Sequence, residues 1–154
     1  ISADEFFSQS YDKVLLPMIS HVVEVEGPVL DAMLARRIAR AHGWQRTGAR
    51  ILERVVALAA SAHRSTSEEG STFFWPSDLE PGAVIGFRRA AEDSARSVDE
   101  VCLQELTALA RDVLATGLTA EAAVLAMARE LGLQRLRAAS RGRFEEAMAR
   151  ACSS

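Results

Sequence analysis

The stretch EGPVLDAMLARRIARAHGWQRTGARILERVVALAASAH, residues 26–63, decides the fold, because its pattern returns near the C-terminus. The offset that carries Gly43-Trp44-Gln45-Arg46 onto Gly132-Leu133-Gln134-Arg135 also aligns Arg54 with Arg143. Each copy has an apolar-periodic helix, a glycine, a short polar turn and a second amphipathic helix. This pattern is typical of a helix-turn-helix unit, and its recurrence predicts two related helical modules.

Apolar residues at helical spacing extend the first copy in both directions. The predicted helices are Tyr11–Val25, Val29–Ala41 and a third that runs from the N-cap Thr47 to Ala62. Gly43 is expected in the left-handed conformation that ends the second helix. The aromatic run 71–75 predicts a strand, paired with the 64–67 region across Glu68-Glu69-Gly70. Three helices followed by a hairpin is the order of a winged helix.

The second half of the chain predicts three more helices and no wing. The expected spans are Ser97–Thr116, Ala120–Leu131 with Thr119 as N-cap, and Leu136–Ala151. The predicted fold is therefore mainly α, with two helix-turn-helix (winged-helix-like) units, the first carrying a small β-hairpin wing. The predicted organisation is a frayed lead-in (1–10), the first unit (11–76), a connector (77–96) and the second unit (97–154), packed as one compact body.

Positive charge is concentrated in the two copies, although the net charge of the chain is -3. Residues 28–64 hold seven arginines against two acids, a balance of +5, whereas residues 65–105 hold three arginines against nine acids. Lys13 is the only lysine, so the cations are planar guanidiniums, which suit phosphate or carboxylate. Such arginine enrichment is equally typical of a GC-rich genome.

The candidate nucleic-acid-binding residues lie at the turn, on the helix before it and at the start of the helix after it, because a helix-turn-helix contacts bases and phosphates there. They are Arg36, Arg37, Arg40, Gln45, Arg46, Thr47 and Arg50 in the first copy and Arg135 in the second. The structural alternative is that Arg46 and Arg50 pair with Glu24, Glu26 or the acidic connector and only hold the fold together.

Phe73, Phe74 and Trp75 allow two interpretations. At a wing tip they would stack on bases, a contact that contributes about 1–3 kcal/mol per base. Alternate residues of a strand face opposite sides, however, so at least one side is core, and core packing is the favoured interpretation.

No catalytic or metal-binding pattern stands out. The sequence lacks GxxxxGK[ST], GxSxG and HExxH motifs, and its three histidines lie without cysteine or acid at ligand spacing. The acid pairs Glu92-Asp93 and Asp99-Glu100 have no neighbouring base. We therefore expect no enzyme activity, no metal and no cofactor in this chain. Cys102 is expected to be a small buried hydrophobe.

The first residue, the apolar runs and the cysteine count bear on the origin of the chain and its cellular location. The first residue is Ile1 and not Met, which suggests a piece of a longer protein. No apolar run approaches the roughly 20 residues that span a bilayer, and no signal segment is visible. Two cysteines are too few for a disulfide framework. A cytoplasmic location without membrane contact is the expectation.

Several short elements together resemble a known family. They are Glu26-Gly27-Pro28, Arg37-Ile38-Ala39, Gly43, Arg46, Gly48, Arg50, Phe74-Trp75 and Leu131-Gly132, spread from about Leu16 to Ala151. This combination resembles the domain of unknown function at the C-terminal end of very large bacterial superfamily 1 DNA helicase-like proteins. The resemblance implies a helicase ATPase and an endonuclease-like domain upstream in the same polypeptide, and it carries over no catalytic residue.

Two functions follow as hypotheses. The first is a non-catalytic accessory domain of a helicase-like protein that binds DNA through its arginine-rich helix-turn-helix face. The alternative is a protein-protein or intramolecular docking module without nucleic-acid contact, which an exposed apolar patch would mark.

Overall fold

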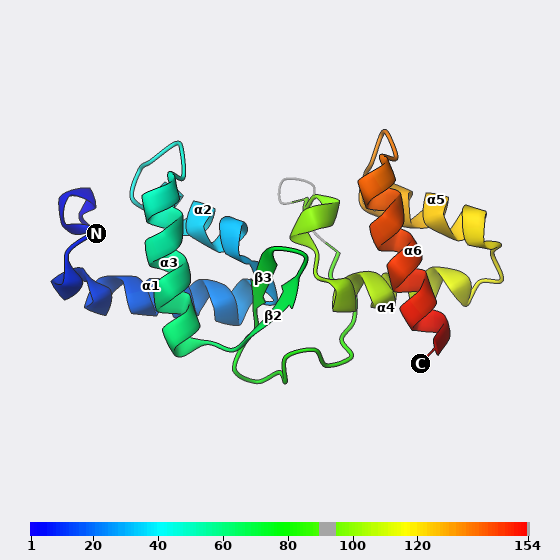
Figure 1. Ribbon diagram of the computed structural model, residues 1–154, viewed down its shortest axis with the longest axis horizontal. Coiled ribbons are helices and arrows are strands. Elements are labelled where there is room, and N and C mark those ends of the chain that lie inside the picture. The colour runs from blue at the N-terminus through cyan, green and yellow to red at the C-terminus, as the bar shows by residue number, and fades with distance from the viewer. Residues whose placement is uncertain (90–94, 154) are drawn as a thin grey trace. The chain divides into compact units, whose positions relative to one another are not determined.

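The computed structural model describes residues 1–89 and 95–153 (Figure 1). Within them lie six α-helices and one three-stranded antiparallel sheet, which confirms the prediction of a mainly helical chain. The chain divides into two compact units, Ile1–Pro81 and Gly82–Ser154. Packing of the units as one body stays a prediction, and the acid pair Glu92-Asp93 lies outside the described residues.

The first unit is built on α1 (Asp12–Glu26), α2 (Asp31–Ala41) and α3 (Ala49–Ala62), which pack against one another. The predicted apolar stripes form its core; fully buried members are Leu15, Ile19, Val23, Leu34, Val55 and Ala59. Thr47 is not the N-cap of α3. The first helical hydrogen bond runs from Leu52 N to the Gly48 carbonyl (3.0 Å), so Gly48 takes that place.

The predicted hairpin is confirmed as β2 (Ser65–Glu68) and β3 (Ser71–Phe74). A third strand, β1 (Val29–Leu30), pairs with β3 on its other side and gives the sheet order β1-β3-β2. The sequence prediction placed Val29 and Leu30 at the start of the second helix. Two apolar residues are too few to show a strand period, and they extend the helical stripe of α2 without a break.

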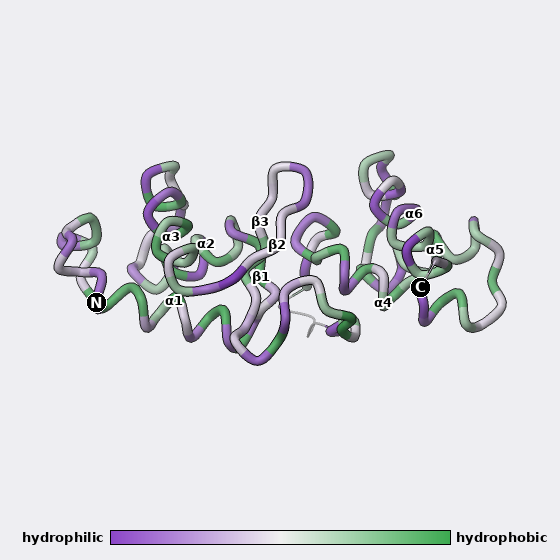
Figure 2. Tube along the Cα trace, turned by 60° about the horizontal axis from the view of Figure 1, so that its bottom comes forward, coloured by the Kyte–Doolittle hydropathy of each residue, from purple (hydrophilic) through white to green (hydrophobic). Residues whose placement is uncertain are grey.

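The aromatic strand belongs to the core. Phe73 and Phe74 are fully buried and Trp75 nearly so, while Trp75 Nε1 donates to Thr66 Oγ1 at 2.9 Å. The interpretation of these rings as a base-stacking wing tip is therefore wrong. Both faces of β3 are covered, and Figure 2 shows hydrophilic residues at the hairpin tip, where Glu68 and Glu69 lie.

The first ten residues are not a frayed lead-in. Phe6 is fully buried against Phe7, Tyr11, His42 and Trp44, with ring centroids 5.0 to 6.2 Å away. Short 3-10 turns at Ala3–Glu5 and Gln9–Tyr11 lead into α1. A polar-looking segment is thus tied down by one buried ring, a contact with residues more than thirty positions away that no local pattern reveals.

Arg54 of α3 fixes the same segment. Its guanidinium donates to the carbonyls of Phe6 (2.7 Å) and Ser8 (2.8 Å) and pairs with Asp12. Its side chain is 18% exposed, so these bonds are shielded from competing water. The lead-in is consequently part of the first unit.

The second unit comprises a 3-10 turn η4 (Val98–Glu100), α4 (Leu103–Leu114), α5 (Ala120–Glu130) and α6 (Ala138–Ser153). The helix predicted from Ser97 begins only at Leu103, because Ser97 and Glu100 cap η4 reciprocally and the chain extends at Val101. Thr119 caps α5 as predicted, accepting from Ala122 N at 3.2 Å. Cys102 is fully buried, as expected.

The turn between the second and third helices has the same hydrogen bonds in each unit. Trp44 N donates to Ala39 O and Leu133 N to Ala128 O, both at 3.0 Å. The preceding glycines adopt positive φ, 84° at Gly43 and 69° at Gly132, which confirms the predicted left-handed residue at Gly43.

One fully buried carboxylate organises the start of the second unit. Glu105 of α4 accepts from the Arg88 side chain (3.1 and 2.7 Å), from Arg88 N (3.0 Å) and from Arg96 (2.7 and 3.0 Å). Burial by itself raises the pKa of Glu105, but the hydrogen bonds and charges of Arg88 and Arg96 outweigh it, so this pKa lies below 4.5. Two residues of the predicted connector are therefore bound to α4.

Phe6→Ala is expected to lower the free energy of unfolding by about 3–5 kcal/mol, because it leaves a cavity at a fully buried ring. Phe7→Ala, at a side chain that is 43% exposed, should cost clearly less. Urea denaturation of both variants measures the difference. Equal, small effects would show that the N-terminal segment is detached in solution.

Glu105→Gln is expected to destabilise the second unit by about 3 kcal/mol at pH 7, since it leaves two arginines without their buried counter-charge. A carboxyl with a lowered pKa stabilises the fold above its unfolded-state pKa, and this contribution disappears as pH falls through the folded-state pKa. The gap between wild type and variant in thermal unfolding should therefore shrink below about pH 4. The control Glu121→Gln removes an exposed pair with Arg141 and should change stability little; an equal loss there would contradict the special role of Glu105.

Candidate nucleic-acid interface

The predicted interface is built by α2, the turn after it and the first turn of α3. Gly43 ends α2 with a left-handed residue, and Gly48 starts α3 with extended backbone. Between them the chain exposes Gln45 and Arg46, whereas Thr47 is half-buried. The local sequence thus presents polar side chains at the turn because two glycines confine the connection to a few residues.

Two of the predicted arginines are engaged within the fold. Arg37 Nε lies 3.1 Å from both carboxylate oxygens of Glu26, the last residue of α1. The guanidinium of Arg50 lies over the ring of Phe7, 4.3 Å from its centroid, which is a cation–π contact. Arg37 and Arg50 therefore act as bridges to α1 and to the N-terminal segment.

Arg36 and Arg40 lie one helical turn apart on the exposed side of α2. Arg36 contacts the Met33 sulfur at 3.8 Å. The side chain of Arg40, like that of Arg46 in the turn, is exposed and makes no hydrogen bond or ion pair with any residue in 1–89 or 95–153. Arg40 and Arg46 are therefore two first-unit arginines of the predicted interface that make no polar contact with the described part of the fold.

Neither Glu24 nor Glu26 pairs with Arg46 or Arg50, whereas pairing with the acidic connector stays a prediction, because Glu92 and Asp93 lie outside the described residues. Glu26 takes Arg37, and Glu24 accepts the backbone N–H of Ser77 at 3.1 and 3.2 Å. The hydrogen bonds from Ser77 lower the pKa of Glu24 despite its partial desolvation, with a smaller contribution from His63. Both carboxylates are thus occupied.

Arg135 belongs to the second unit and is exposed at the turn before α6. It lines a hollow of about 580 Å³ together with Arg137 and Arg143. The latter two were not among the predicted residues. The alignment of Arg54 with Arg143 was the signal that could have drawn attention to that position.

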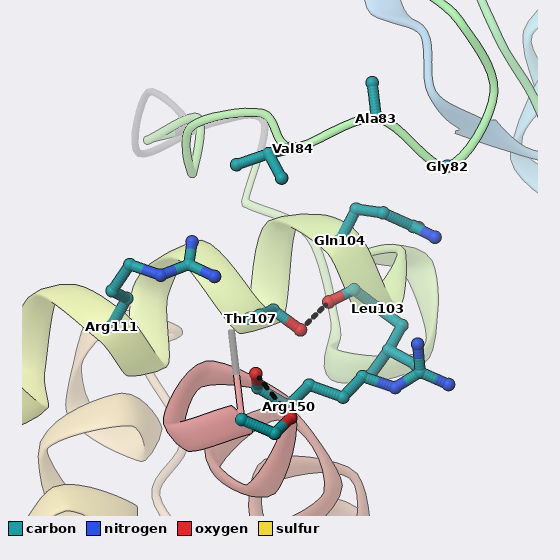
Figure 3. Close-up of a pocket in the computed structure, with 9 residues that line it drawn as sticks. Gly82, Ala83, Val84, Leu103, Gln104, Thr107, Arg111 and Arg150 are labelled. Atoms are coloured by element: carbon teal, nitrogen blue, oxygen red, sulfur yellow. Dashed lines mark hydrogen bonds between the residues drawn. The ribbon is translucent and has the colours of Figure 1, made fainter.

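A second hollow, of about 270 Å³, lies along α4 of the same unit (Figure 3). Residues 82–84 of the chain pass over it, and Arg111 and Arg150 contribute from α4 and α6. The Oε1 atom of Gln104 in its wall is buried and has no hydrogen-bond partner among the described residues. Gln104 Oε1 is therefore available as a hydrogen-bond acceptor. Thr107 Oγ1 instead donates to the Leu103 carbonyl at 2.7 Å.

Within residues 1–89 and 95–153, no group of three or more histidine, cysteine or acidic residues is arranged to hold a metal ion. No helix in that part of the chain combines the length and apolar character that crossing a membrane requires.

The N-terminal part of the chain is similar to a known protein family. Residues 4–53 match the model of a family described as a protein of unknown function (DUF3320). The match covers the N-terminal segment, α1, α2, the turn and the start of α3, and so includes every first-unit residue of the predicted interface. No curated protein and no solved structure matches the chain. Resemblance to a family of unknown function is thereby confirmed, whereas the link to helicases stays a prediction.

Arg46→Ala is expected to change the free energy of unfolding by less than about 0.5 kcal/mol, because its exposed side chain makes no hydrogen bond or ion pair with any described residue. Arg54→Ala should cost about 3 kcal/mol, since it removes the guanidinium that bonds the Phe6 and Ser8 carbonyls and pairs with Asp12. Chemical denaturation of the two variants provides the comparison. A large loss for Arg46→Ala would assign that arginine a structural role.

Proposed function

We propose that the first unit is a winged helix-turn-helix and that it binds nucleic acid through Arg36, Arg40, Gln45 and Arg46. In this proposal the chain is a non-catalytic accessory domain, and the two helix-turn-helix units are copies of one module. The helicase-like context rests on the sequence resemblance alone.

The topology of the first unit supports the winged-helix part. Its elements follow in the order α1-β1-α2-α3-β2-β3, and β1 pairs with β3 at the side opposite β2. The hairpin is thereby anchored to the chain between α1 and α2, which supports its assignment as a wing in this proposal. Because Glu68 and Glu69 occupy its tip, we expect the turn and α2, and not the hairpin, to approach the phosphates.

The observation that carries the proposal is the pair of exposed, unpaired guanidiniums of Arg40 and Arg46. An arginine that the fold does not use is available to form forked hydrogen bonds with phosphate oxygens. Gln45 lies exposed beside Arg46 and offers an amide, which can recognise adenine.

The docking alternative is favoured by a different observation. Leu118, which precedes α5, is 38% exposed, and Leu125, on α5, is 47% exposed. Exposed leucines on one element can contribute to a protein contact. This alternative predicts association that is indifferent to added DNA.

Fluorescence anisotropy with a labelled 20-base-pair duplex, at 50 and 200 mM salt, tests the proposal. We expect a Kd of about 1–100 μM that weakens steeply with salt, because each neutralised phosphate releases counterions. Arg40→Ala/Arg46→Ala should weaken binding and lower the slope of log K against log salt by about 2, since two phosphate contacts are lost.

The control is Arg89→Ala/Arg129→Ala, which removes the same charge from exposed positions of the second unit, one of them, Arg89, paired with Glu130. It should leave most of the binding in place. Equal losses of affinity in both double variants would show that only net charge matters. Absence of binding at 50 mM salt would contradict the nucleic-acid proposal and favour the docking alternative.

A further inference from the structure

The hollow beside Arg135 has a defined position in the second unit. It lies between η4, which contributes Val98 and Asp99, and the start of α6, which contributes Ala139, Ser140 and Arg143. Leu133, Arg135 and Arg137 from the turn complete its wall. We call it the basic hollow.

The charges that line the basic hollow are three arginines and one acid. Arg135 and Arg137 are exposed and make no hydrogen bond or ion pair with any described side chain or carbonyl. Arg143 is held in place by the carbonyl of Val98, to which it donates at 2.6 Å. Asp99 accepts from the Ser97 hydroxyl at 2.7 Å. The three guanidiniums outnumber this one carboxylate, so the net charge of the lining is positive.

The beginning of α6 adds unpaired N–H donors. The first helical hydrogen bond there runs from Arg141 N to Arg137 O at 2.9 Å. The amides of Ala139 and Ser140, both in the wall, come before it and have no carbonyl within the helix to bind. Free amides and unpaired guanidiniums together favour an anion with several oxygens.

The corresponding place in the first unit is filled. The offset of 89 residues that superimposes the two turns carries Trp44 onto Leu133, Arg50 onto Ala139 and Arg54 onto Arg143. In the first unit the ring of Trp44 packs on Phe6, and Arg50 covers Phe7. The second unit has no ring at Leu133 and no guanidinium at Ala139, so the same place stays open.

We propose that the basic hollow binds a phosphate group through Arg135, Arg137 and the first amides of α6, with Arg143 positioning η4 as its opposite wall. Its volume of about 580 Å³ exceeds that of a bare phosphate, so the hollow has room for a molecule that carries the group. Two sources share this chemistry: a small phosphorylated metabolite and the terminal phosphate of a nucleic-acid strand. The inference does not depend on the first unit binding nucleic acid.

Amide chemical-shift mapping of the full chain with inorganic phosphate tests the site. Titration to 20 mM should shift residues 97–99 and 135–143 in a saturable way, and Arg135→Ala/Arg137→Ala should weaken this binding at least tenfold. Arg40→Ala/Arg46→Ala should leave it unchanged, which separates this inference from the proposed function. Absence of shifts in those segments, or equal shifts in the Arg135/Arg137 variant, would overturn the proposal.

Organic ligands then identify the source. Adenosine 5′-monophosphate should bind the hollow while adenosine does not. A 5′-phosphorylated trinucleotide that binds at least tenfold more tightly than both the monophosphate and the unphosphorylated trinucleotide identifies a strand end. Equal affinity for the monophosphate and the phosphorylated trinucleotide identifies a small phosphorylated molecule. Equal binding of adenosine and its monophosphate contradicts phosphate recognition.

Discussion

An arginine of the third helix, donating to a backbone carbonyl ahead of the first helix, closes each unit. Arg54 binds the carbonyls of Phe6 and Ser8, and Arg143 binds that of Val98. The Ser8 and Val98 carbonyls also accept from Tyr11 N and Val101 N, so the guanidinium adds a second donor to each of them, whereas the Phe6 carbonyl accepts from Arg54. In each unit the guanidinium therefore ties the segment before the first helix to the third helix. The two candidate sites lie in these two units.

The remaining arginines separate by what they contact. Arg37, Arg88 and Arg96 neutralise carboxylates within the fold, and Glu105 is fully buried because two of them surround it. Arg40, Arg46, Arg135 and Arg137 have no such partner among the described residues. In our proposals, a net charge of -3 conceals two local surfaces that suit anions, one beside each of the glycine turns.

The two units differ in the side chains around the glycine turn and not in its backbone. Matching hydrogen bonds at Gly43-Trp44 and Gly132-Leu133 hold the same backbone, while the side chains around it differ. Rings from Phe6, Phe7 and Trp44 fill the place in one unit, and the smaller residues of the other leave it open. In our proposal the units share a scaffold and bind anions with different parts of it.

The sequence by itself determined the helices, the glycine turns, the β2–β3 hairpin and the burial of Phe73 and Phe74, because each follows from short-range periodicity or backbone preference. Only the tertiary structure decided the pairing of β1, the burial of Phe6, the Glu105 cluster and which arginines stay unpaired. These depend on contacts between residues far apart in the chain, and a guanidinium has the same sequence signature whether it meets a carboxylate, a ring or water.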